Sequence, residues 1–187
     1  MKKIFFAALT CAMVSLTSCD KLKDATSRDI KVNNVKFEFA ATSSNATGTR
    51  EAVVTRVGTD NTFTVTRLVN ITELGNAEIT EYAEKISKVA VNSPLLKITA
   101  SPSGSYTVAD VTVTAEGVAG TLSVLSYTLG NAFTPPTNMN AYTTAFVTKL
   151  ISAKLVSVTV SGKTDAPAGT VIRISYESDL VLTASLL

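Results

Sequence analysis

The stretch from residue 62 to residue 69 reads Thr-Phe-Thr-Val-Thr-Arg-Leu-Val. Successive side chains of a β-strand point to opposite faces, so a polar–apolar repeat of two residues predicts a strand with one buried face. The same repeat recurs at 35–39, where valine and phenylalanine alternate with lysine and glutamate, and at 111–115. This period predicts a chain made mainly of half-buried strands.

Turn residues separate these strands from further apolar runs. Gly58-Thr59-Asp60-Asn61 lies between the runs 52–57 and 62–69, and this predicts a hairpin. Pro94 interrupts the run that begins near residue 89, and this predicts a bulge or an edge. Because valine and threonine pack well on a pleated surface, the expected fold is a mainly β, antiparallel β-sandwich of about eight or nine strands.

Two segments break the period of two. Ile79, Tyr82, Ala83 and Ile86 recur at the spacing of one helix face, and this predicts a helix of about three turns with Asn76 as its N-cap. A second short helix is expected at 141–153. One of its sides is formed by Tyr142, Phe146, Lys149 and Leu150. When the two helix–strand segments are aligned at an offset of sixty residues, they share a pattern of apolar and polar positions. Either an internal helix–hairpin repeat or chance can explain this match.

Composition excludes several classes of function. Of the 187 residues, 45% are hydrophobic and 17% are charged, a balance that is not typical of a disordered chain. The 17 basic and 15 acidic residues leave little net field, and this argues against nucleic acid as a partner. The chain contains no histidine, so no Ser-His-Asp triad and no histidine-bearing zinc site can form. No metal site and no cofactor are expected.

The amino-terminal segment has the organisation of a secretory signal. Met1-Lys2-Lys3 is basic, and residues 4–14 are uncharged and mostly apolar, which is too short a run to span a bilayer. The following Leu16-Thr17-Ser18-Cys19 resembles the lipobox of bacterial lipoproteins. The resemblance implies removal of residues 1–18, a diacylglycerol on the Cys19 thiol and a fatty acid such as palmitate on the new amino terminus. It also implies an anchor in the cell envelope, and we expect the outer membrane.

This interpretation divides the chain into three parts. They are a signal peptide (1–18), a lipidated tether (19–30) and a single β-sandwich domain (31–187). Lys2 and Lys3 account for the net charge of +2, so the remainder carries equal numbers of basic and acidic residues. Because two or more acyl chains hold a protein stably at a bilayer, the anchor would be effectively permanent.

The irregular segment at 130–140 is the best candidate for a binding surface. It carries Phe133, Pro135, Pro136 and Met139, which are apolar groups on a loop, where binding residues often lie. The alternative is that Phe133 and Met139 fold back into the end of the sandwich.

Two kinds of short-range residue pair are weaker candidates for chemistry. Ser152 with Lys154, and Ser161 with Lys163, have the minimum content of a serine–lysine nucleophile, a spacing that is common by chance. Glu177 and Asp179 lie two residues apart, and we expect them on a solvated strand face or a bulge. No catalytic residue is assigned, and we expect that the protein is not an enzyme.

The sequence favours a non-enzymatic lipoprotein that binds or assembles with a protein or glycan partner at the envelope. The chain has no tryptophan to stack a sugar ring, and Tyr106, Tyr127 and Tyr176 are the substitutes. The alternative is a carrier of an apolar or lipid ligand, which requires an apolar cavity of roughly 300–1,000 Å³ within the sandwich.

Overall fold

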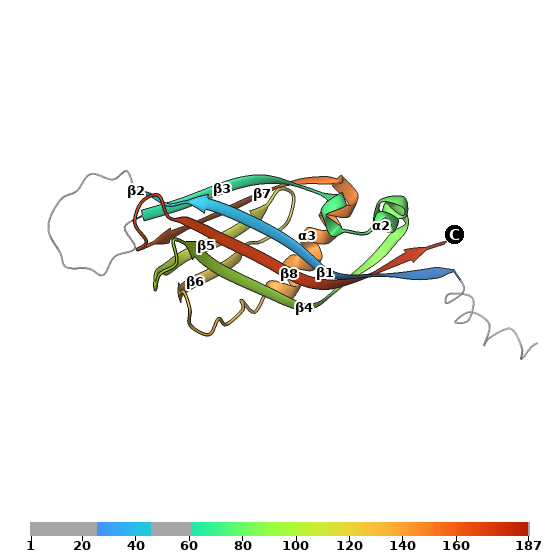
Figure 1. The fold of residues 1–187 in the computed structure, drawn as a ribbon. Coiled ribbons are helices and arrows are strands. Elements are labelled where there is room, and N and C mark those ends of the chain that lie inside the picture. Colours follow the sequence, from blue (N-terminus) through green and yellow to red (C-terminus); the bar gives the residue numbers. More distant parts are fainter. Residues whose placement is uncertain (1–25, 46–60, 187) are drawn as a thin grey trace, which may run out of the picture.

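The computed structural model describes residues 26–45 and 61–186. Within these ranges the chain forms two antiparallel sheets, one of three strands and one of five. They face each other, with helix α3 packed at one side (Figure 1). The predicted antiparallel β-sandwich is therefore confirmed. The signal peptide, Cys19 and the strand predicted at 52–57 lie outside the described residues.

The three-stranded sheet has the order β1-β8-β4. Its strands are β1 (Ser27–Thr42), β8 (Val171–Ser185) and β4 (Ile86–Ser101). Ser27 pairs with Ser185 and Ile86 pairs with Ala184, so the start of β1, the end of β8 and the start of β4 share one end of the molecule. Because β1 already begins at Ser27, the predicted tether of 19–30 was too long at its carboxyl end.

The five-stranded sheet has the order β2-β3-β7-β5-β6. Its strands are β2 (Ser44–Asn45), β3 (Asn61–Asn70), β7 (Leu155–Thr164), β5 (Thr107–Ala115) and β6 (Leu122–Thr128). The alternating stretch quoted first lies in β3, with Phe63 and Val69 buried and Thr64 and Thr66 exposed. Outward hydroxyls bond across strands, as in the 2.8 Å contact between Thr66 Oγ1 and Thr159 Oγ1.

The first predicted helix is shorter than the three turns that the sequence pattern predicts. Asn76 is its N-cap and its side chain accepts a 2.9 Å hydrogen bond from Glu78 N, but helix α2 (Ala77–Glu81) is followed by a 3₁₀ turn, η2 (Ala83–Lys85). Another 3₁₀ turn, η1 (Ile71–Leu74), precedes α2. Ile86 already belongs to β4, so the prediction of three turns was wrong. Pairing with β8 extends the strand into residues that local spacing assigns to a helix.

Helix α3 (Met139–Ala153) contains the second predicted helix and begins two residues earlier. Tyr142, Phe146 and Leu150 are buried, as the predicted face requires. The two helix–strand segments do not occupy equivalent places, because Ile86 begins β4 while its counterpart Phe146 lies within α3. Moreover β4 belongs to the three-stranded sheet and β7 to the five-stranded sheet. The structure therefore gives no support to a helix–hairpin repeat.

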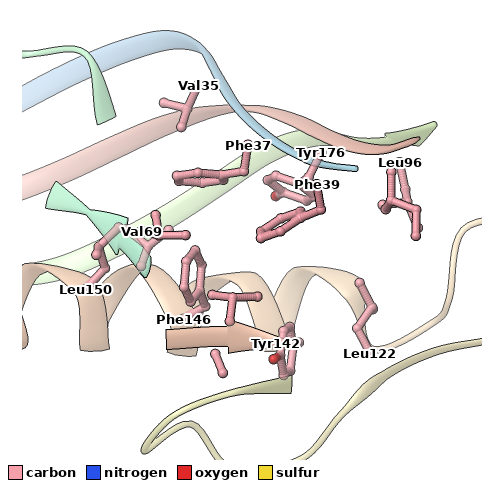
Figure 2. Packing of buried hydrophobic residues seen from close by; sticks show 14 of the residues in the cluster. Val35, Phe37, Phe39, Val69, Leu96, Leu122, Tyr142, Phe146, Leu150 and Tyr176 are labelled. Carbon is pink, nitrogen blue, oxygen red and sulfur yellow. The ribbon is translucent and has the colours of Figure 1, made fainter. Parts of the chain in front are cut away.

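The core lies between the sheets and under α3. Phe37 on β1 meets Phe146 edge-on with ring centroids 5.4 Å apart, and it stacks on Tyr176 of β8 at 6.3 Å. Figure 2 shows these rings between the three-stranded sheet and the helix, with Leu150 and Val69 beside them. Aromatic contacts of this kind add about 0.5–1.5 kcal/mol to the free energy gained from buried area.

Irregular strand positions gather around one part of β8. The register of β1 shifts between Val32 and Val35, and the register of β4 shifts between Asn92 and Leu95. The second shift contains Pro94 and so confirms the predicted bulge. Asp179 lies between the two shifts, where its Oδ1 accepts a 2.8 Å hydrogen bond from Asn34 N. Its carboxylate therefore has a structural partner.

At the opposite end, Ser43 joins the two sheets. This residue is 2% exposed. Its Oγ donates a hydrogen bond to Pro167 O at 2.6 Å and accepts one from Thr170 N at 3.1 Å. Its backbone N–H also donates to Thr170 O at 2.8 Å. These bonds fix the β7–β8 connection where β1 passes into β2.

We expect Ser43→Ala to lower the free energy of unfolding by about 1–2 kcal/mol, because it removes both hydroxyl hydrogen bonds from a buried site. Ser44→Ala is the matched control, since Ser44 Oγ makes one exposed contact of 3.4 Å. Urea denaturation followed by circular dichroism measures the difference. Equal midpoints for the two variants would contradict the role assigned to Ser43.

Candidate interaction site

The predicted loop follows β6 and turns back beside it. The Phe133 ring meets the Tyr127 ring edge-on, with centroids 5.0 Å apart, and Tyr127 Oη donates a 3.0 Å hydrogen bond to Asn131 O. Asn138 Nδ2 donates to Thr121 O at 2.9 Å. The loop is thus attached to β6 at both ends of the strand.

The four predicted loop residues do not form one exposed surface. Met139 is the first residue of α3 and is 2% exposed, so its assignment to a binding surface was wrong. Phe133 is half-buried, Pro136 is half-buried and Pro135 is exposed. The apolar side chain that begins α3 gains more by entering the core than by remaining in water. Of the four, Phe133, Pro135 and Pro136 remain accessible in part.

The accessible part of this region is the neighbouring strand. Leu125, in the middle of β6, is 81% exposed, and Ser123 and Ser126 beside it are also exposed. Leu122 and Val124 point into the core. Within the described residues β6 pairs with β5 alone, so its outer edge has no strand partner. We take this edge, Leu122–Thr128, together with loop residues 129–138 as the candidate interaction site.

Sequence reasoning missed the edge. The segment Leu-Ser-Val-Leu-Ser-Tyr-Thr contains no charged residue. Its two leucines, Leu122 and Leu125, are three residues apart and therefore point to opposite faces of a strand. That second leucine was the available signal, since Leu125 breaks the pattern of one buried face. Which strand ends a sheet depends on long-range pairing, and the local pattern does not contain this information.

The weaker candidates for chemistry have other partners. Ser152 Oγ donates to Lys149 O, Ser161 Oγ contacts Thr112 Oγ1 at 2.9 Å, and Lys163 Nζ pairs with Asp110 Oδ2 at 2.7 Å. Glu177 pairs with Lys97 at 3.5 Å and with Lys36 at 3.9 Å. Neither serine–lysine pair therefore has the geometry of a nucleophile and its base.

No three potential metal-ligating side chains gather within residues 26–45 and 61–186. In the same part of the chain, no helix has the length and apolar content needed to cross a bilayer.

The interior holds a small cavity between the sheets and α3. Its volume is about 40 Å³, and its lining includes Phe37, Phe146, Tyr142 and Tyr176. Ligand pockets of the kind a carrier needs measure roughly 300–1,000 Å³. The cavity is too small for an acyl chain, so in this conformation the structure gives no support to the alternative of a carrier.

Two tyrosine hydroxyls beside this cavity are desolvated. Burial raises the pKa of Tyr142 to about 12. Burial also raises the pKa of Tyr176, and the nearby hydroxyls of Ser178 and Thr143 offset part of that rise. Neither tyrosine oxygen makes a hydrogen bond of ordinary geometry within the described residues. Both phenols therefore belong to the packed core, and Tyr176 is not available to stack a sugar ring.

No family model matches the chain, and no curated protein matches it in a sequence comparison.

Burial of the Tyr142 hydroxyl predicts a loss of stability in alkali. With a folded pKa of about 12 against 10.0 for the ordinary side chain, Tyr142 stays neutral in the folded state while the unfolded state ionises. The pH dependence that Tyr142 adds to stability should therefore be flat below pH 10 and should be a loss of stability between pH 10 and 12. Tyr142→Phe should reduce this fall and change the stability at pH 7 by less than about 1 kcal/mol. Urea melts at pH 8 and pH 11 test this, and an unchanged fall in the variant would contradict it.

Proposed function

We propose that the protein is a lipid-anchored lipoprotein of the bacterial envelope that acts as a non-enzymatic binding or assembly module. Cys19 carries the acyl chains, and the outer membrane is the proposed location. The β6 edge and residues 129–138 form the proposed interaction site. The observation that carries the assignment of a binding role is the 81% exposure of Leu125 on an unpaired strand edge.

The chain length between anchor and domain supports this arrangement. Cys19 precedes Thr26 by seven residues, and an extended chain of that length spans at most about 25 Å. The end of the sandwich where β1 begins would therefore lie close to the bilayer. Since β6 runs along the side of the sandwich, its edge would stay accessible beside the membrane (Figure 1).

The remaining surface favours a localised site. Outward threonine and serine side chains of the five-stranded sheet bond to one another, as Thr112 Oγ1 does with Ser161 Oγ at 2.9 Å. On the three-stranded sheet, charges of opposite sign alternate, and Glu38 pairs with Lys36 at 3.5 Å and with Arg173 at 3.8 Å. Such satisfied polar faces offer little binding energy, whereas an open strand edge offers backbone hydrogen bonds.

A polypeptide fits the site better than a glycan. Sugar recognition without tryptophan would use tyrosine faces, but Tyr176 is 8% exposed and Phe133 packs edge-on against Tyr127. Strand addition needs neither, because affinity comes from main-chain groups and specificity from alternate side chains.

The anchor is tested by intact-mass spectrometry of the protein purified from its own host. We expect a mature chain that starts at Cys19 and carries the added mass of a diacylglycerol and an amide-linked fatty acid. Cys19→Ser should retain the uncleaved chain and lose that mass. A free Cys19 thiol, or a mature terminus elsewhere, would contradict the proposed anchor.

A further inference from the structure

Within residues 26–45 and 61–186 the two sheets have four borders, and two of them, β1 and β4, carry features that discourage pairing with another strand. Proteins protect such borders with lysine, proline, bulges or very short strands. On β1 there is a register shift between Val32 and Val35 beside Lys31 and Lys36. At the other border of that sheet, β4 has its own shift at Asn92/Leu95. It also carries Pro94, Lys88 and Lys97. The border strand β2 is described only at Ser44 and Asn45, next to residues outside the described ranges, so it does not enter this comparison.

The fourth border, β6, has none of these features within the strand, and the loop that follows it returns to Thr121 at the other end of the strand. Residues Leu122–Thr128 include no charged side chain and no proline, and their register with β5 runs from Thr107/Thr128 to Val113/Leu122 without a shift. Leu125 at its centre is more exposed than the other exposed large hydrophobic residues, of which Leu68 at 59% is next. A regular, uncharged edge with an exposed leucine is a template for a further strand.

We propose that the strand received by this edge is β6 of a second copy of this chain, so that two five-stranded sheets join edge to edge in a symmetric, antiparallel pair. This deepens the proposed function, on which it rests, by naming the partner of the same site. A two-fold axis at Leu125 sets Leu125 opposite Leu125 of the second copy. The adjoining exposed residue, Ser123, then lies opposite Tyr127.

Self-pairing is favoured by electrostatics and by shape. A two-fold axis at Leu125 sets this residue opposite its own equivalent and sets the other β6 residues opposite residues of the same short strand, so a charged edge would be close to charges of the second copy, and β6 carries no charge. The proposed mature chain carries equal numbers of basic and acidic residues, so long-range repulsion between copies is weak. The pairing would also cover both copies of Leu125, the apolar side chain that contacts water most.

Cysteine cross-linking of the full chain in its membrane tests the pairing. Directly opposed residues in an antiparallel pair have Cα atoms about 4.5–5.5 Å apart, within the range that a disulfide bridges. After mild oxidation, Leu125→Cys should give a disulfide-linked dimer on a non-reducing gel. Leu68→Cys is the matched control, since Leu68 is also exposed on the outer face of this sheet but lies on β3, which is paired with β7.

The unmodified chain separates the two proposals. If Cys19 is acylated and Cys11 is removed, wild type and Leu68→Cys stay monomeric and only Leu125→Cys is linked, which supports the pairing. Dimers in all three variants would show a free thiol and overturn the proposed anchor. Monomers in all three would leave the anchor standing and overturn the pairing of β6 with itself.

A second variant tests the same surface without oxidation. Leu125→Lys should weaken dimerisation in detergent, measured by analytical ultracentrifugation, by at least about tenfold in Kd, because two lysines would then face each other. Leu68→Lys should leave Kd unchanged within about twofold. Equal effects of the two substitutions, or a wild-type chain that is monomeric up to high protein concentration, would overturn the proposal.

Discussion

The contact of α3 with the three-stranded sheet is the constraint on which the rest of the structure depends. The two sheets alone would leave the inward faces of β4 and β6 open at one side, and α3 fills that side with Tyr142, Phe146 and Leu150 (Figure 2). Phe146 meets Phe37 at 5.4 Å and so fixes the helix to β1. With α3 in this place, a cavity of about 40 Å³ is left in the interior, and Leu122 lies beside Tyr142 and Phe146 in its lining.

The same constraint explains why Met139 does not contribute to the accessible apolar surface beside β6. Met139 begins α3 and is drawn into the core with the rest of the helix, which removes the residue that the sequence placed on a binding surface. Phe133 is half-buried because its ring packs on Tyr127. The loop is attached to β6 at both ends of the strand, and the outer edge of β6 has no strand partner within the described residues.

The proposed anchor and the proposed edge place two different limits on partners. With the proposed anchor, a tether of at most about 25 Å would keep the end of β1 near a bilayer and restrict the orientations the domain can adopt. Pairing through β6 uses a side of the sandwich, so two anchored copies can meet without either leaving the membrane. Confinement to one surface raises the effective concentration of each copy for the other, which allows a short strand pair to associate.

The strands were predictable because alternation is a local property: the buried residues of β3 and β7 keep a period of two, and those of β1 keep it on each side of its register shift. The Asn76 cap, the Pro94 bulge and the buried face of α3 follow from equally local rules. Local rules failed at Ile86, where pairing with Ala184, almost a hundred residues later, ends the helix and begins β4. They also failed at Met139 and Leu125, whose burial depends on what packs across from them.

By itself the sequence determined the class of fold, since hydrophobic alternation and turn chemistry are written along the chain. The tertiary structure alone decided which sheet each strand joins, how small the interior is and which edge stays open. Those features arise from contacts between residues far apart in sequence, and the free energy of such contacts is not a property of any single segment.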